Sequence, residues 1–203
     1  MSVSYSICLL AGGQARRMGG GDKGEIDVGG KTLITSLIER YALAPYMMLN
    51  ANGDARRFAH YGLDIIADIL PDYQGPLAGI YTALSHIKTH RPHDSYVAIL
   101  PTDAPLLPDT LIQDMIAAAI SHDAPLVSVK SHGRRHPVIG LWSLSVFEAL
   151  EKAVCEEGVR KIDAFTTPLN CHYISYDEDP DPFLNLNRPD DVTAYRNAMG
   201  EEG

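Results

Sequence analysis

The sequence is short of basic residues. Lysine and arginine number 17 against 26 aspartates and glutamates, which gives a formal net charge of −9 over 203 residues. Proteins that bind nucleic acids or anionic membranes through a broad surface need that surface to be basic. We therefore expect no nucleic-acid partner and no membrane partner. A small basic pocket for one anionic ligand is still compatible with this charge.

Cysteine is scarce, and long apolar runs are missing. Cys8, Cys155 and Cys171 are scattered without Cys-x-x-Cys spacing. This pattern argues against a disulfide framework or a zinc site and is typical of reduced thiols in the cytoplasm. No segment approaches the roughly 20 apolar residues that cross a bilayer, and the apolar run Ile7–Ala11 has no basic residues before it, unlike a signal peptide. The expected location is cytoplasmic.

What the sequence does contain is a regular alternation of apolar strands and amphipathic helices. Because single helices separate the strands, we predict an α/β domain covering residues 1–203, with a mostly parallel sheet between helical layers. The run Val138–Trp142 follows a turn at His132–Gly133 and is expected to add an antiparallel strand at an edge. Strands are predicted at Ser4–Leu10, Tyr46–Asn50, Leu63–Ala67, Tyr96–Leu100, Leu126–Val129, Pro137–Trp142 and His172–Tyr176, and helices at Leu33–Leu43, Pro76–Thr89, Pro108–Ser121, Leu144–Cys155 and from about Pro189.

The most informative stretch is the loop after the first strand, which reads AGGQARRMGGGDKG over residues 11–24. Its glycines let backbone N–H groups approach an anion without obstruction by Cβ atoms. Arg16, Arg17 and Lys23 add positive charge. Since ligands of open α/β sheets bind beyond the carboxyl ends of the strands, this loop is predicted to hold a triphosphate. A glycine turn with solvated charges is the alternative.

This loop resembles the signature of molybdenum cofactor guanylyltransferases, in the form LAGGxARRMGGxDKG over residues 10–24. The resemblance continues in order along the chain. It includes NAN at 50–52, Asp68, DYQGPLAG at 72–79, PTDAP at 101–105, His136-Pro137 and NLNRP at 185–189. Those enzymes belong to the wider nucleotidyltransferase group, so the resemblance implies a three-layer, Rossmann-like nucleotidyltransferase fold.

A carboxylate follows the strand Tyr96–Leu100, which the alternation predicts to be central. Asp103 facing a triphosphate would repel it unless a divalent cation lay between them, and Mg²⁺ usually enters such sites through one or two carboxylates plus phosphate oxygens. We therefore predict that Asp103 binds Mg²⁺, and the resemblance implies the same role. The alternative is a cap for the helix near Pro108.

Asn50 and Asp68 each end a predicted strand, so both are expected on one rim of the sheet. An aspartate accepts hydrogen bonds either from ribose hydroxyls or from guanine N1–H and N2–H₂, and the alternative for Asp68 is a cap or surface turn. The resemblance implies a catalytic set of Arg17, Lys23 and Asp103. It implies a nucleotide-binding set of Leu10, Ala11, Gly12, Gly13, Lys23, Asn50, Asp68, Gly75, Gly79 and Asp103.

A second set of polar residues is expected to bind the acceptor molecule. Asn185 and Asn187 flank Leu186, so their amides would face one side of an extended segment. Arg134 and Arg135 in the turn before His136 are a further candidate pair for an acceptor phosphate, or solvated surface charges. The resemblance implies contact with the pterin for Arg160, Lys161, Asn185 and Asn187.

The function implied is transfer of GMP from GTP to molybdopterin, with or without its metal. The acceptor phosphate would attack the α-phosphorus in line, and pyrophosphate would leave, stabilised by Mg²⁺, Lys23, Arg17 and loop amides. The product would be the guanine dinucleotide cofactor. The resemblance also implies contact with molybdoenzymes or other proteins of cofactor biosynthesis.

Three rival functions share parts of this pattern. A cytidylyltransferase of the same pathway usually has Leu-Ala-Ala-Gly where this chain has LAGG at 10–13. A sugar-1-phosphate nucleotidyltransferase uses a similar loop but lacks the pterin-side resemblance and is often longer. A non-catalytic GTP-binding adaptor would bind nucleotide without releasing pyrophosphate, and the presence of Lys23 and Asp103 counts against it.

Overall fold

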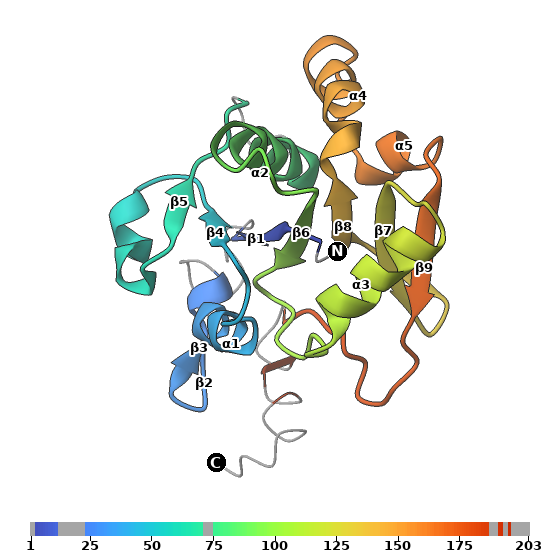
Figure 1. Ribbon diagram of the computed structural model, residues 1–203. Coiled ribbons are helices and arrows are strands. Elements are labelled where there is room, and N and C mark those ends of the chain that lie inside the picture. The colour runs from blue at the N-terminus through green and yellow to red at the C-terminus, as the bar shows by residue number, and fades with distance from the viewer. Residues whose placement is uncertain (1–2, 12–22, 71–74, 187–190, 193–194, 196–203) are drawn as a thin grey trace.

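The centre of the molecule is a seven-stranded sheet with strand order β5-β4-β1-β6-β8-β7-β9 (Figure 1). The computed structural model describes residues 3–11, 23–70, 75–186, 191–192 and 195. Its strands are β1 (Tyr5–Leu10), β4 (Met47–Asn50), β5 (Asp64–Ile66), β6 (Tyr96–Pro101), β7 (Leu126–Ser131), β8 (Arg134–Ser143) and β9 (Cys171–Ser175). Neighbours in the sheet are parallel except where β8 pairs with β6 and β7.

The predicted mostly parallel sheet with one antiparallel strand is therefore confirmed, but the expected edge position of that strand is wrong. β8 lies inside the sheet because β7 and β9 continue it on the far side. The second half of β8 is buried accordingly, with Leu141 and Trp142 at most 1% exposed. The central position predicted for the Tyr96–Leu100 strand is confirmed, since β6 lies between β1 and β8.

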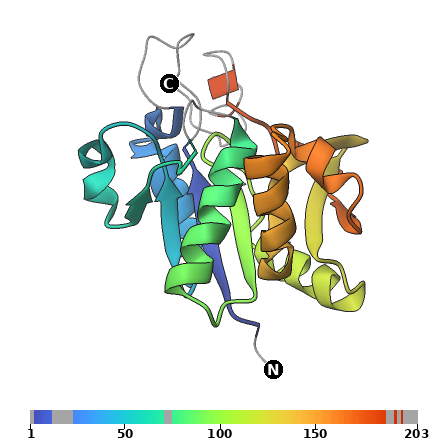
Figure 2. The same ribbon diagram turned by 90° about the horizontal axis from the view of Figure 1, so that it is seen from above.

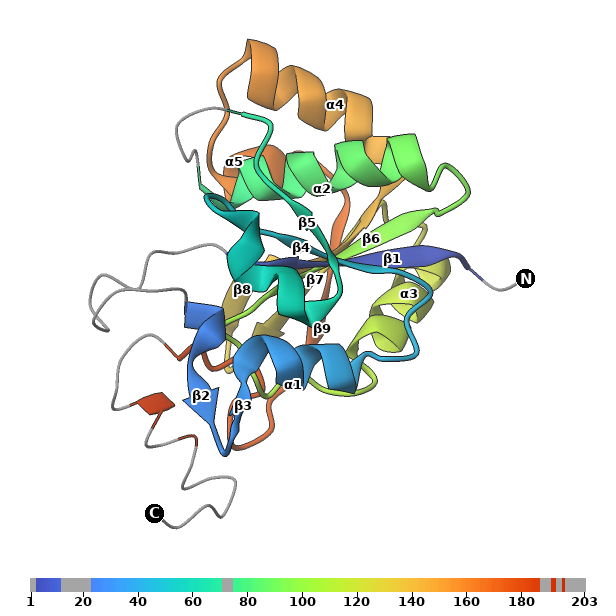
Figure 3. The same ribbon diagram turned by 90° about the vertical axis from the view of Figure 1, so that its left-hand side faces the viewer.

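Helices cover both faces of the sheet (Figure 3). On one face lie α1 (Leu33–Arg40) and α3 (Leu111–Ser121), and on the other α2 (Pro76–His90), α4 (Phe147–Glu151) and α5 (Ile162–Thr166). Successive side chains of β1 point to opposite faces, so that Ile7 and Leu9 join the first core and Cys8 and Leu10 the second. A strand buried on both faces reads as a continuous apolar run, as observed.

Local signals explain where two of the helices begin. Thr32 caps α1 by accepting a hydrogen bond from the backbone N–H of Thr35. Gly75 precedes α2 with φ +85°, a conformation that favours glycine, and Pro76 occupies the first turn. The predicted helix at Pro108–Ser121 begins only at Leu111. The predicted helix at Leu144–Cys155 divides into a 3₁₀ turn (Leu144–Val146), α4 and a π-turn (Lys152–Glu156).

A small hairpin packs beside the main sheet. Strands β2 (Asp27–Val28) and β3 (Lys31–Thr32) are joined by Gly29 and Gly30, both with positive φ, which is the tight turn that two consecutive glycines permit. The hairpin residue Val28 belongs to a third buried cluster with Leu33, Leu186, Val192 and Tyr195. Of the predicted closing helix only residues 191–192 and 195 are described, and these are helical.

Two short 3₁₀ helices complete the described fold, η1 (Lys23–Glu25) and η2 (Ala55–Tyr61). Within the described ranges, no helix is both long and apolar enough to cross a membrane.

Candidate functional site

The carboxyl ends of β1, β4, β5 and β6 meet at one rim of the sheet, opposite the N-terminus of the chain (Figure 2). Leu10 lies in register with Asn50 on one side and with Pro101 on the other. Backbone hydrogen bonds continue past the strand ends, from the Ala11 N–H to the Asn50 carbonyl (2.9 Å) and from the Thr102 N–H to the Leu10 carbonyl (3.2 Å). The rim is therefore a fixed platform for the segments that follow each strand.

On one side of β1, the Asp68 carboxylate is held by two asparagine amides. The Asn50 side chain donates to Oδ1 (2.9 Å) and the Asn52 side chain to Oδ2 (2.8 Å). The Asp68 N–H donates in return to the Asn52 Oδ1 atom (2.8 Å), and Asn50 also donates to the Ile66 carbonyl (3.0 Å). A carboxylate has about four acceptor positions, so each oxygen can still accept from a ligand.

Asn52 is a residue that the site prediction did not include. It is the last residue of the NAN motif at 50–52. Its role depends on the register between β4 and β5, which brings the segments after these two strands together. A polar residue two positions beyond Asn50 was the available signal, because alternate residues of an extended segment share a face. Thr82 is similar: its buried hydroxyl accepts from the Ile69 N–H (3.1 Å) next to Asp68.

Two glycines allow close packing around this rim. A Cβ atom on Gly79, in the second turn of α2, would lie 2.6 Å from the Asn50 Oδ1 atom and 3.1 Å from the Leu10 side chain. A Cβ atom on Gly24 would lie 2.9 Å from the Thr102 hydroxyl. The backbone at Lys23 and Gly24 is thus brought beside the end of β6, directly before Asp103.

Replacing Gly79 with alanine should disturb the Asn50 amide, which is only 6% exposed and cannot move without breaking its bonds to Asp68 and Ile66. Overpacking of this kind costs about 1–3 kcal/mol of unfolding free energy. We expect that loss in urea unfolding, together with nucleotide binding about tenfold weaker. A variant with wild-type stability and wild-type affinity would show that Asn50 can shift without consequence.

On the other side of β1, Asp103 is half-buried just beyond β6. The N-cap of α3 is Thr110, so Asp103 does not occupy that capping position. Its backbone carbonyl accepts from the Leu186 N–H (2.8 Å). Asn185, the residue before Leu186, is therefore brought next to Asp103 from a distant part of the chain.

Arg160 and Lys161, also predicted to bind the acceptor, lie farther along the sheet. Arg160 and Lys161 precede α5, which packs over β8, and both side chains are exposed. One guanidinium nitrogen of Arg160 donates to the carbonyls of Val154 (3.0 Å) and Val159 (3.1 Å). The order of strands puts β1 and β6 between these residues and the Asn50 side of the rim.

Arg135, which with Arg134 is the other candidate for binding an acceptor phosphate, lies over the ring of Tyr173 at 4.7 Å from its centroid. Four of the predicted site residues, Gly12, Gly13, Arg17 and Asn187, lie outside the described residues, as does the side chain of Lys23.

The structure thus brings most of the described residues that were predicted for the site together at one rim: Leu10, Ala11, Asn50, Asp68, Gly75, Gly79, Asp103 and Asn185, with the backbone of Lys23. In the described part of the chain, no three His, Cys, Asp or Glu side chains are grouped so as to hold a metal. A single carboxylate is nevertheless enough for Mg²⁺ that binds together with substrate phosphates and water.

Comparison with known proteins matches residues 7–169 to the MobA-like NTP transferase domain family. The chain is 42% identical over 188 residues to a molybdenum cofactor guanylyltransferase of Bradyrhizobium sp. (strain ORS 278), covering 91% of this chain and 88% of that protein. It is 35% identical over 191 residues to one of Shewanella sp. (strain MR-4), covering 94% of each.

Solved structures also share the fold. Molybdopterin-guanine dinucleotide biosynthesis protein A from Archaeoglobus fulgidus superposes with a TM-score of 0.77 at 22% identity, covering 97% of this chain and all of that one. The 4-diphosphocytidyl-2C-methyl-D-erythritol synthase of Anaerococcus prevotii superposes with a TM-score of 0.74 at 11% identity, covering 98% of this chain and 97% of that one. The Rossmann-like nucleotidyltransferase fold predicted from the sequence is confirmed.

Proposed function

The chain belongs to the MobA-like NTP transferase family and is a nucleotidyltransferase, and we propose that it transfers GMP from GTP to molybdopterin or to the molybdenum cofactor built on it. In this reaction an oxygen of the acceptor's terminal phosphate attacks the α-phosphorus of GTP. The bond from that phosphorus to the bridging oxygen of the β-phosphate breaks, and pyrophosphate leaves with the electron pair. The product is the guanine dinucleotide form of the cofactor.

The observation that carries the proposal is the placement of Asp68 and Asp103 on either side of the end of β1. The loop with the glycines and cations begins at that same end. A nucleotide bound across this point would have its base near Asp68 and its phosphates near Asp103. Such a position beyond the carboxyl ends of parallel strands is the usual place for ligands of open α/β sheets.

We propose that Asp68 recognises the guanine edge, whose N1–H and N2–H₂ groups are both donors. Asn50 and Asn52 each donate to one oxygen of this carboxylate and fix its orientation. A group that only accepts suits guanine better than cytosine, whose pairing edge presents one donor and two acceptors. Gly75, beside which a Cβ atom would meet nothing within 4 Å, would leave room for the base at the start of α2, and Gly79 would contribute by letting the Asn50 amide pack against that helix.

On the phosphate side, Asp103 would hold Mg²⁺, and Lys23, Arg17 and loop amides would bind the triphosphate. Mg²⁺ bound there would neutralise charge on the phosphates and on the leaving pyrophosphate. The protein's own contribution is to position the two substrates in line and to hold donors where charge develops. No side chain needs to form a covalent intermediate.

The acceptor would lie along the rim from β6 toward β8. Asn185 next to Asp103 would contact its pterin, and Asn187 is proposed for the same role. Arg160 and the exposed Lys161 at the start of α5 would bind farther along. We also propose that the reaction takes place in the cytoplasm, where free thiols stay reduced, and that molybdoenzymes or other proteins of cofactor biosynthesis receive the product.

Nucleotide selectivity tests this proposal cheaply. With Mg²⁺, GTP at about 100 times its Kd should stabilise the fold by about 2.7 kcal/mol and raise the Tm by about 5–10 °C, whereas CTP and ATP should leave it unchanged. Differential scanning fluorimetry measures this shift. A shift with CTP but not with GTP would instead support the cytidylyltransferase.

Pyrophosphate release from GTP and molybdopterin tests the chemistry separately. We expect release that requires both substrates. A protein that is stabilised by GTP but releases no pyrophosphate in their presence would be an adaptor and not the proposed enzyme.

A further inference from the structure

A segment near the C-terminus crosses from the far edge of the sheet to the candidate site. Residues 177–186, here called the crossing segment, follow β9 and end at Leu186, whose N–H donates to the Asp103 carbonyl (2.8 Å) (Figure 1). The Leu186 side chain is fully buried with Val28 and Leu33. The crossing segment therefore sets the position of Asn185 and contacts the backbone of the residue proposed to hold Mg²⁺.

The middle of the crossing segment is tied to the β7–β8 hairpin by a chain of polar side chains, of which Ser131 and His136 are buried and Asp181 is half-buried. Ser131, at the end of β7, donates its hydroxyl proton to the Asp181 Oδ2 atom (3.0 Å). The Nε2 atom of His136, in β8, lies 2.7 Å from the same hydroxyl oxygen. Since the serine proton is used on Asp181, this oxygen accepts from a proton on His136 Nε2.

His136 is suited to that donor role. Burial lowers its pKa and so favours the neutral ring, and the geometry at Ser131 calls for the proton on Nε2. The imidazole also lies beside the ring of Phe183, with 5.0 Å between centroids. Phe183 is 1% exposed, and its N–H donates to the Asp181 Oδ1 atom (2.9 Å).

From these contacts we propose that Ser131 and His136 are positioning residues for the transfer reaction, acting through Asp181 and the crossing segment on Asn185 and Asp103; this inference rests on the proposed function. The chain of contacts is continuous. His136 binds the Ser131 hydroxyl, which binds the Asp181 carboxylate. The Leu184 N–H then closes a turn by donating to the Asp181 carbonyl (3.2 Å). Two residues later the Leu186 N–H meets Asp103. An apolar contact would bury the same surface, but directional hydrogen bonds fix one register of the segment.

Ser131→Ala removes the central link and tests the inference. A displacement of about 1 Å at reacting groups costs up to 10²-fold, so we expect kcat/KM for molybdopterin to fall by about 10- to 100-fold. The Kd for GTP should stay within about twofold, because the Asn50–Asp68 side of the rim does not contact the crossing segment in any described interaction. His136→Gln, which keeps an N–H donor, should retain more activity than His136→Leu.

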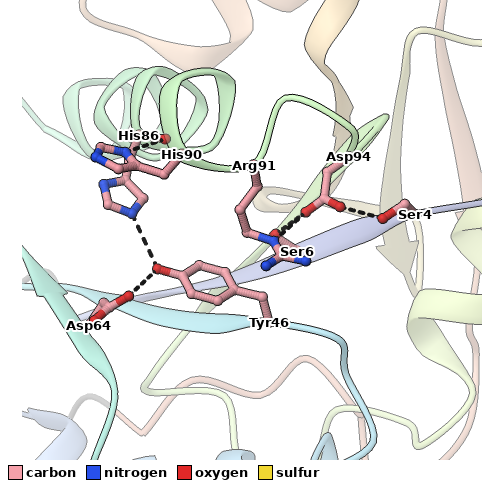
Figure 4. Close-up of polar contacts among 8 residues, drawn as sticks. All are labelled: Ser4, Ser6, Tyr46, Asp64, His86, His90, Arg91 and Asp94. Carbon is pink, nitrogen blue, oxygen red and sulfur yellow. Dashed lines mark hydrogen bonds and ion pairs between the residues drawn. The ribbon is translucent and has the colours of Figure 1, made fainter.

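The opposite rim of the sheet offers a matched control. Ser6, also fully buried, donates its hydroxyl to the carboxylate of Asp94, which is 5% exposed and also bound by Ser4 and by Arg91 (3.0 Å) (Figure 4). Ser6→Ala thus removes a comparable serine–carboxylate bond far from the site. Both variants should lose about 2–8 °C in Tm, but Ser6→Ala should keep wild-type kinetics.

Hydrogen exchange gives a second readout that does not depend on activity. Ser131→Ala should speed exchange of the Leu186 N–H by at least tenfold relative to Ser6→Ala. Should Ser131→Ala fail to fold, Asp181→Asn at its half-buried position carries the same expectations, since an amide has one acceptor atom for two donors. The inference is refuted, while the proposed function stands, if the wild-type protein is active and Ser131→Ala or Asp181→Asn behaves like Ser6→Ala. The two quantities to compare are kcat/KM for molybdopterin and the exchange rate of the Leu186 N–H. A wild-type protein that releases no pyrophosphate refutes the proposed function and the inference with it.

Discussion

Replacing Asp103 with alanine will lower turnover by about 10²–10³-fold, comparable to the loss of one donor that stabilises transition-state charge. The reason is that the Asp103 carboxylate lies just beyond the end of the central strand β6, where Mg²⁺ would bind together with the phosphates. Charge on the leaving pyrophosphate grows as the bond breaks, so the loss should fall mainly on kcat rather than on KM for GTP. Pyrophosphate release measured across a range of GTP concentrations, repeated at several Mg²⁺ concentrations, gives both constants and their metal dependence.

Asp109→Ala is the matched control for this variant. Asp109 lies on the same connection between β6 and α3, but its side chain is 80% exposed and pairs with Arg40 (2.6 Å). Removing it changes the net charge by the same amount and should leave kcat within about twofold, since exposed ion pairs contribute little. Full Mg²⁺-dependent activity in Asp103→Ala would show that another group binds the metal.

Much of the fold was predictable because its strands are buried on both faces. β1 and β6 read as continuous apolar runs, and both predicted strands overlap the observed ones almost completely. The strand order was not predictable from such runs, and this is why β8 was expected at an edge. The start of α3 was placed too early because carbonyls of the preceding segment accept hydrogen bonds from the end of α1: Arg40 donates to the Leu107 carbonyl (2.7 Å) and the Tyr41 hydroxyl to the Pro108 carbonyl (2.9 Å). No local pattern indicates these tertiary contacts.

The division of the predicted Leu144–Cys155 helix into three parts could not be predicted from the sequence, for a different reason. Its apolar residues Phe147, Leu150, Ala153 and Val154 are spaced as in an α-helix and pack into one core. The same spacing is compatible with the wider π-turn observed over Lys152–Glu156. Hydrophobic periodicity alone therefore predicts a helical segment here and does not distinguish its hydrogen-bond pattern.

For the candidate site, position at a strand end was the useful signal. Asn50, Asp68 and Asp103 were expected at one rim, because the carboxyl ends of parallel strands meet there, and the structure brings them to it. Asn52 was missed, since its bond to Asp68 requires the register of β4 and β5. The pairing of Ser131 with Asp181 joins residues 50 positions apart, and no local pattern indicates such a contact.

Asp68→Asn will lower kcat/KM for GTP by about 10²-fold. Asn50 and Asn52 both donate to the Asp68 carboxylate, and an asparagine can accept at one atom only. Its own NH₂ group must then face either a neighbouring amide or the guanine donors. Losing a charged acceptor and leaving a donor unpaired in a recognition pocket costs about 2–3 kcal/mol, which corresponds to the expected factor. Steady-state kinetics with GTP at fixed molybdopterin measures it.

Inosine triphosphate, which lacks the 2-amino group, decides which part of the nucleotide Asp68 contacts. If Asp68 accepts from the base edge, the wild-type preference for GTP over inosine triphosphate should shrink in Asp68→Asn. Equal losses for both nucleotides would assign Asp68 to the ribose. Asp64→Asn is the control: Asp64 begins β5, the strand that Asp68 follows, and is bound by the Tyr46 hydroxyl (2.5 Å) (Figure 4). This variant should leave both rates unchanged. Wild-type kinetics in Asp68→Asn would remove Asp68 from nucleotide recognition.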